Sequence, residues 1–118
     1  MAHILVVDDD VVSRRLMGGI LESAGHEVAY AGDGASALRL YRTQSFAAVI
    51  LDVVMPVKNG LETLRELLET DRHARVVMVS GARDGDLALA KELGAIETLQ
   101  KPTGHEDLLR AVGSAIAR

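Results

Sequence analysis

Five short apolar runs, each followed by a segment with apolar residues at helical spacing, constrain the fold most strongly. The runs are rich in β-branched residues, as expected of strands buried on both faces of a sheet. Strand and helix patterns that alternate along a chain predict a parallel sheet with helices on both faces and right-handed crossovers. The expected strands are residues 3–7, 27–31, 47–51, 75–79 and 95–99.

Residues suited to helix ends separate these patterns. Asp10 is expected to cap the first helix, and Gly25 and Gly94 are expected to end the first and the fourth. Thr103 and Glu106 are interpreted as a capping box that opens the last helix.

The first helix carries Val12, Leu16 and Ile20 at helical spacing, with Met17, Leu21 and Ala24 beside them, and we expect these residues to form its apolar face. Gly18 and Gly19 stand in the same helix, where each glycine should cost about 1 kcal/mol relative to alanine. Close packing against a neighbouring element is the simplest explanation for this pair.

Length, charge and composition limit the classes of function. The chain has 118 residues and a net charge of −4, which suits one domain over residues 1–118 and argues against direct binding to nucleic acid. There is no cysteine, and therefore no disulfide framework or thiolate metal site. The N-terminus does not fit a signal peptide, and no apolar run has the length that spans a membrane. We expect a soluble, cytoplasmic protein that binds no membrane.

Polar residues follow four of the five expected strands. Asp8 and Asp9 follow the first strand, Asp52 the third, Ser80 the fourth, and Lys101 lies just beyond the fifth. Ligands of open parallel sheets bind outside the carboxyl ends of the strands. We therefore expect three carboxylates, a hydroxyl and an ammonium group at one edge of the sheet.

Carboxylates this close together need a compensating cation, or some of them must take up protons. A hard divalent ion with oxygen ligands is the natural compensation, and Mg²⁺ accepts a few carboxylates while keeping several waters. The sequence therefore predicts an Mg²⁺ site that includes Asp8, Asp9 and Asp52.

The chain resembles the receiver domain of two-component response regulators over its whole length. The resemblance rests on "VVDDD" at 6–10, "ILDVVMPVKNG" at 50–60, "VMVSG" at 77–81 and "LQKP" at 99–102. Each motif alone is weak, but the order, with each motif after its own strand, is highly specific. The resemblance implies a flavodoxin-like (βα)5 fold of the α/β class, doubly wound, with five parallel strands in the order 2-1-3-4-5.

The resemblance also implies roles for the strand-end residues. Asp52 would accept a phosphoryl group from a histidine of a partner kinase or of a histidine phosphotransfer protein. Ser80 and Lys101 would bind phosphoryl oxygens, and the bond between Lys101 and Pro102 would be cis. Phosphoryl transfer of this kind needs positioning and charge neutralisation more than covalent work by the protein.

The Mg²⁺ ligands implied by the resemblance are Asp9 directly, Asp8 mainly through water, the Asp52 carboxylate and the backbone carbonyl of Val54. Val54 and Ala82 stand where the family tunes hydrolysis of the aspartyl phosphate. Neither side chain can orient water, so we predict a slowly hydrolysed phosphoryl group.

This sequence departs from the family pattern at two positions. Thr98 stands where an aromatic switch residue is usual, and Thr103 stands where Phe is frequent. We therefore expect the signal to travel mainly through Ser80 and the loop of residues 81–85, since phosphorylation adds charge and acceptor oxygens there.

Three functional readings remain. The first is a stand-alone phosphorylation-dependent switch that docks to a downstream target protein, and the second is a receiver module excised from a longer response regulator or hybrid kinase. The third is an Mg²⁺-dependent aspartyl phosphatase, but such enzymes usually place a second acid where Val54 stands, so we do not expect a multiple-turnover enzyme. The family resemblance also implies that a homodimer can form through the fourth and fifth helices.

Overall fold

The computed structural model describes residues 2–55, 59–81 and 84–118, in which strands and helices alternate as expected. The strands are β1 (His3–Val7), β2 (Glu27–Ala31), β3 (Ala48–Asp52), β4 (Val76–Ser80) and β5 (Glu97–Gln100). The helices are α1 (Val11–Ser23), α2 (Gly34–Thr43), α3 (Gly60–Thr70), α4 (Asp84–Leu93) and α5 (His105–Ala117).

The strands form one parallel sheet in the order β2-β1-β3-β4-β5, which confirms the expected fold. The three central strands are almost wholly buried, whereas β2 and β5 form the edges and are partly exposed. Because all five strands are parallel, their carboxyl ends lie along the same edge of the sheet, the one perpendicular to the strands.

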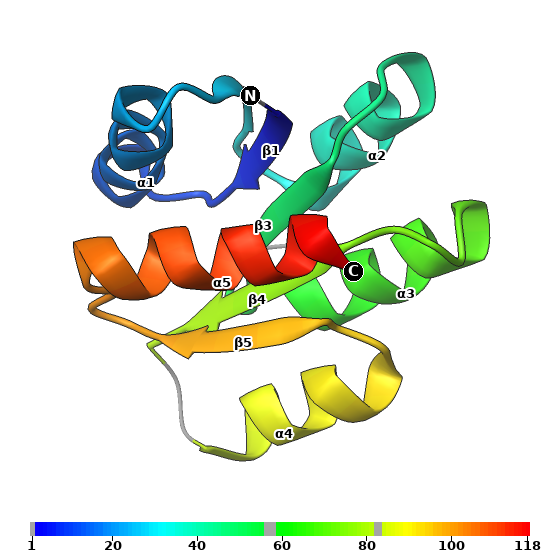
Figure 1. Ribbon diagram of the computed structural model, residues 1–118. Coiled ribbons are helices and arrows are strands. Elements are labelled where there is room, and N and C mark those ends of the chain that lie inside the picture. The colour runs from blue at the N-terminus through cyan, green and yellow to red at the C-terminus, as the bar shows by residue number, and fades with distance from the viewer. Residues whose placement is uncertain (1, 56–58, 82–83) are drawn as a thin grey trace.

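Helices cover both faces of the sheet (Figure 1). Alternate residues of β1 point to opposite faces: Ile4 and Val6 belong to the apolar cluster on the side of α1 and α5, while Leu5 and Val7 belong to the cluster on the side of α2, α3 and α4. Two apolar layers result, and together they fix the strand ends in place.

The buried face of α1 is narrower than the expected apolar face. Met17 and Leu21 are buried, whereas Val12 is 66% exposed and Leu16 63% exposed. The expectation is therefore confirmed for Met17 and Leu21, and Ile20 also packs against the core, but it was wrong for Val12 and Leu16, which lie outside the side of α1 that contacts the sheet. Val12 and Leu16 instead form part of a surface groove.

The two glycines of α1 have different surroundings. A Cβ at Gly18 would overlap the ring of Tyr30, whereas a Cβ at Gly19 would meet nothing within 4 Å. Close packing therefore explains Gly18 and does not explain Gly19, for which nothing in the structure gives a reason.

Most of the expected helix ends are confirmed. The Asp10 carboxylate accepts a hydrogen bond of 3.2 Å from the Val12 N–H and caps α1. Gly25 and Gly94 follow their helices with φ values of +92° and +117°, a backbone region that favours glycine.

The capping box at Thr103 is contradicted. Gly104 takes the N-cap position of α5 and supplies no side-chain hydrogen bond, because the helix begins one residue later than expected. The Thr103 hydroxyl is buried and, among the residues described, has no hydrogen-bond partner.

The fifth strand begins later than expected, at Glu97 rather than residue 95. The Ala95 N–H donates to the Ala90 carbonyl at 3.0 Å, so the chain is still completing the end of α4 at that point. Nowhere in the described ranges is a helix both long enough and apolar enough to cross a lipid bilayer.

Candidate functional site: an acidic cluster at the strand ends

Four strand ends bring the candidate residues to one edge of the sheet. Asp8 follows β1, Asp52 ends β3, Ser80 ends β4, and Lys101 follows β5. The β3–β4 register pairs Asp52 with Val79, so Ser80 lies one residue beyond that pair. The predicted convergence of these residues is therefore present in the fold.

The carboxylates of Asp8, Asp9 and Asp52 form a tight cluster. One oxygen from each lies within 4.8 Å of the others. Asp8 is fully buried and Asp52 is 5% exposed, whereas Asp9 is exposed to solvent. The cluster is therefore open on the Asp9 side and closed on the Asp8 side.

Lys101 bridges two of these acids. Its Nζ lies 2.8 Å from Asp8 Oδ2 and 3.5 Å from Asp52 Oδ2. Burial alone would lower the pKa of Lys101, but the hydrogen bond and charge of Asp8 and the charge of Asp52 raise it above its usual value. Lys101 is therefore an ammonium ion held between two carboxylates.

Asp8 is stabilised as a carboxylate despite its burial. Desolvation raises its pKa, but hydrogen bonds from Lys101, the Asp10 N–H and Ser13, together with the Lys101 charge, lower it below the usual value. The Asp10 N–H donates to Asp8 Oδ1 at 2.9 Å, so both Asp8 oxygens have donors.

Asp52 has the opposite electrostatic balance. Burial and the negative charge of Asp8 raise the pKa of Asp52 to about 6, and Lys101 and the Val54 N–H offset this only in part. The ionised carboxylate of Asp52 therefore has too little positive charge around it to be fully stabilised, and a bound cation would supply that charge.

The chemistry of these donors fits Mg²⁺. Three carboxylates offer the hard oxygen ligands that Mg²⁺ prefers, and the exposed side of the cluster leaves room for the water ligands that it keeps. The second positive charge would also compensate the Asp52 carboxylate, which Lys101 alone does not neutralise.

Backbone groups fix the position of Asp52. The Gly60 N–H donates to the Val53 carbonyl at 2.7 Å, and a Cβ at Gly60 would overlap the Asp52 carbonyl.

The Val54 side chain is 58% exposed and offers no polar group to the cluster. The described residues do not include Ala82, whose predicted part in hydrolysis lies outside them.

The bond between Lys101 and Pro102 is cis, as expected from the resemblance. Ser80 is fully buried, and its backbone carbonyl accepts a hydrogen bond of 2.9 Å from the Lys101 N–H. Of the proposed switch loop of residues 81–85, residues 82 and 83 lie outside the described part of the chain.

Sequence reasoning missed Arg14 and Ser13, which contact Asp8 from the first turns of α1. Arg14 Nη1 donates to the Asp8 carbonyl at 2.8 Å, and Ser13 hydrogen-bonds the Asp8 side chain. Their position in the sequence could have indicated these contacts. Both residues lie in the first turns of a helix that begins at residue 11, directly after the acidic run, and side chains there lie close to the preceding loop.

The fold and the cluster together define a class: a doubly wound α/β domain with three clustered carboxylates, which could hold a metal ion, and a lysine at the strand ends. The family model for the response regulator receiver domain matches residues 4–113. The chain belongs to this family, and it is a receiver domain of the two-component signalling type.

Known relatives cover the chain almost completely. It is 34% identical over 118 residues to a homolog of the transcriptional regulatory protein CpxR from Haemophilus influenzae, and spans 52% of that protein. It is 32% identical to the protein PilH of Pseudomonas aeruginosa, with 99% of each chain covered. A solved receiver domain protein from Clostridium thermocellum has a TM-score of 0.94, with 36% identity over 100% of this chain and 96% of that one. The chain thus spans about half of the CpxR relative and nearly all of PilH.

Proposed function

We propose that this chain is a phosphorylation-dependent signalling switch in which Asp52 accepts a phosphoryl group. The position of the Asp52 carboxylate carries the proposal. It lies at a strand end, 3.5 Å from the Lys101 ammonium group and inside the carboxylate cluster. Asp8 is fully buried with donors on both oxygens, which leaves Asp52 as the better nucleophile.

In the proposed reaction, an oxygen of Asp52 attacks the phosphorus of a phosphohistidine on a partner protein. The P–N bond breaks as the new P–O bond forms, and the leaving imidazole nitrogen takes a proton from water. Lys101 would neutralise charge on one phosphoryl oxygen, and the Ser80 hydroxyl would donate a hydrogen bond to another.

Mg²⁺ would neutralise phosphoryl charge and help to orient the group when bound at this site. The residues that would hold it are Asp9 directly, Asp8 mainly through water, the carboxylate of Asp52 and the carbonyl of Val54. The raised pKa of Asp52 supports this assignment, since the buried carboxylate needs more positive charge than Lys101 provides.

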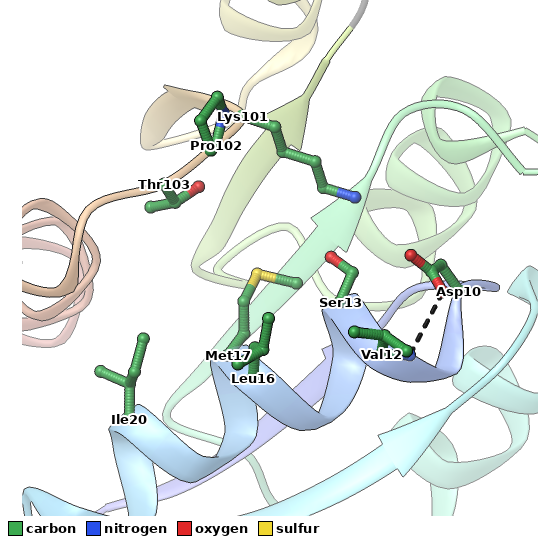
Figure 2. A pocket seen from close by; sticks show the side chains of 9 residues that line it. All are labelled: Asp10, Val12, Ser13, Leu16, Met17, Ile20, Lys101, Pro102 and Thr103. Carbon is green, nitrogen blue, oxygen red and sulfur yellow. Dashed lines mark hydrogen bonds between the residues drawn. The ribbon is translucent and has the colours of Figure 1, made fainter.

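An exposed apolar groove beside the cluster supports docking of a histidine kinase or histidine phosphotransfer protein. Figure 2 shows the groove, of about 450 Å³, between α1 and the segment that follows β5. Lys101 lines both the groove and the acidic cluster, so a partner bound here would lie next to Asp52. The groove is lined by Asp10, Val12, Ser13, Leu16, Met17, Ile20, Lys101, Pro102 and Thr103.

Transfer from autophosphorylated histidine kinase cores tests the docking part of the proposal. Leu16→Gln should slow transfer from the kinases that phosphorylate the wild type, while phosphorylation by acetyl phosphate stays unchanged. Leu89→Gln is the matched control, because Leu89 is 43% exposed on α4, away from the groove. Equal transfer rates in both variants would exclude this groove as the docking surface.

We further propose that the chain is not a multiple-turnover enzyme and loses its phosphoryl group slowly. The residue two positions after Asp52 is Val54, whose side chain has no acidic group that could protonate a leaving group. Sustained hydrolysis of p-nitrophenyl phosphate would contradict the first statement, and rapid loss of phosphate from the purified protein would contradict the second.

We also propose whether the domain acts alone or as part of a longer protein, and where it acts. We favour a single receiver domain over residues 1–118 that acts in the cytoplasm and docks to a downstream target protein, directly binding neither nucleic acid nor membrane. The alternative is a module of a longer response regulator or hybrid kinase. Homodimerisation through α4 and α5 is compatible with either arrangement, and sedimentation of the phosphorylated and unphosphorylated chain measures it.

A further inference from the structure

Arg14 contacts the loop that carries the acidic cluster. Its Nη1 donates to the Asp8 carbonyl at 2.8 Å, and the Asp8 N–H donates to the Ala31 carbonyl at 3.1 Å. Both backbone groups of Asp8 are therefore held from outside the loop. The Asp8 carbonyl shares a planar peptide group with the Asp9 nitrogen, so the contact with Arg14 also orients the backbone of Asp9.

Asp9 depends on this backbone for its position. Across the residues that the structure describes, the exposed Asp9 carboxylate makes no side-chain hydrogen bond. The Asp8 carboxylate, by contrast, has donors in Asp10 and Lys101. An oxygen of Asp9 still lies within 4.8 Å of the other two carboxylates, so its place in the cluster depends on how the Asp9 backbone is held.

Gly32 leaves the space that the guanidinium of Arg14 occupies. A Cβ at Gly32 would lie 3.0 Å from Arg14 Nη1, which is closer than such contacts normally are. A side chain at position 32 would therefore push the guanidinium away from the Asp8 carbonyl. The hydrogen bond from Arg14 to the Asp8 carbonyl therefore depends on two positions: Arg14 donates it, and Gly32 leaves room for the donor.

We propose that Arg14 is a positioning residue, which holds the Asp8 carbonyl so that the Asp9 carboxylate is oriented for Mg²⁺. The inference rests on the proposed function, because it requires Mg²⁺ to bind at the cluster. Partners that orient metal ligands typically contribute about 10–100-fold to metal affinity.

Charge and position predict opposite effects for this residue, which makes the proposal testable. Arg14 is a cation near a cation site, so on charge alone its removal should strengthen Mg²⁺ binding. If Arg14 acts by positioning Asp9, its removal should weaken binding instead. The sign of the change in the Mg²⁺ dissociation constant therefore separates the two roles.

The experiment is calorimetric titration of each purified variant with Mg²⁺ alone, together with urea unfolding to confirm folding. Arg14→Met should raise the dissociation constant about tenfold, and Arg14→Lys, which keeps a donor and the charge, should recover most of that loss. Arg15→Met is the matched control, because Arg15 is the exposed neighbour and carries the same charge. Its dissociation constant should be unchanged or slightly lower.

Gly32→Ala provides a second, independent variant. It should weaken Mg²⁺ binding as well, and the double variant with Arg14→Met should bind no more weakly than Arg14→Met alone, because both changes remove one contact. Unchanged or tighter binding by folded Arg14→Met, or additive effects in the double variant, would overturn the inference. If the wild type itself bound no Mg²⁺, the proposed function would fail, and this inference with it.

Discussion

The Asp52 carboxylate is the least stable charge of the site in the absence of a cation. Its pKa in the folded chain is about 6, against about 3.8 as the ordinary value for the unfolded chain. Because the folded pKa is raised, the folded state binds the proton more tightly, and stability falls as pH rises from about 4 to about 6. Ionised Asp52 therefore destabilises the metal-free protein at neutral pH.

Asp52→Asn should consequently raise the free energy of unfolding of the metal-free protein at neutral pH. A shift of about two pKa units corresponds to about 3 kcal/mol, so we expect a gain of about 1–3 kcal/mol. The gain should shrink as pH falls from about 6 to about 4, and only below about pH 4 does Asp52 become mainly protonated in both the folded and the unfolded state. Urea unfolding of both proteins across this pH range, with chelator present, measures it.

A difference between wild type and Asp52→Asn that stays constant from about pH 4 to neutral would contradict this description of the charge. Asp10→Asn is a suitable control, because Asp10 is exposed and Asn caps a helix about as well as Asp. Its effect on stability should be small at every pH in the range.

At the scale of elements, α1 contains a matched pair of glycines. Gly19→Ala should stabilise the protein by about 0.5–1 kcal/mol, because a Cβ there meets nothing and alanine favours the helix. Gly18→Ala should give no such gain, since its Cβ would displace the Tyr30 ring and weaken the hydrogen bond of 3.3 Å between Tyr30 and Glu22. Thermal or urea unfolding of the two single variants is the measurement.

The Tyr30→Ala background tests the cause of that difference. With the ring removed, Gly18→Ala should become stabilising by about as much as Gly19→Ala, which is about 0.5–1 kcal/mol. If Gly18→Ala remained unfavourable in this background, the overlap with Tyr30 would not be the reason for the glycine.

Element boundaries show how far the sequence could predict the fold. Strand positions followed from apolar runs because the central strands are buried on both faces, and β1 and β2 were predicted to the residue. The apolar face of α1 was predicted too wide, because Val12, Leu16 and Ile20 repeat at the same spacing as Met17 and Leu21, and only the second set is buried. Spacing alone does not show which of two adjacent stripes contacts the sheet.

For the molecule as a whole, Mg²⁺ should stabilise the folded chain, because unfolding separates the three carboxylates. At an Mg²⁺ concentration of about 100 times the dissociation constant, mass action predicts a gain of about 2.7 kcal/mol. Asp9→Asn should lose most of this gain, whereas in Mg²⁺-free buffer with chelator the two proteins should have the same stability apart from the small effect of the lost charge. Thermal unfolding with and without Mg²⁺ tests this, and an equal gain in Asp9→Asn would contradict the assignment of Asp9 as a ligand.

The location of the site could be predicted from sequence because parallel strands bring Asp8, Asp52, Ser80 and Lys101 to one edge. Its electrostatics could not, since the opposite pKa shifts of Asp8 and Asp52 depend on how deeply each carboxylate is buried and on which of the two receives the hydrogen bonds of Lys101 and the Asp10 N–H. The groove beside the site was also missed. It arises where the exposed residues of α1 meet the segment after β5, and no local pattern relates these distant parts of the chain.

The central claim is that Asp52 accepts a phosphoryl group with the help of Mg²⁺, and intact mass measurement tests it most directly. The wild type, Asp52→Asn and the control Asp10→Asn would each be incubated with acetyl phosphate and Mg²⁺, with and without chelator. We predict one phosphoryl adduct on the wild type and on Asp10→Asn, none on Asp52→Asn, and none in the presence of chelator. A phosphoryl adduct on Asp52→Asn would contradict the assignment of Asp52 as the acceptor. A wild type that gains no phosphoryl adduct in the presence of Mg²⁺ would also contradict it.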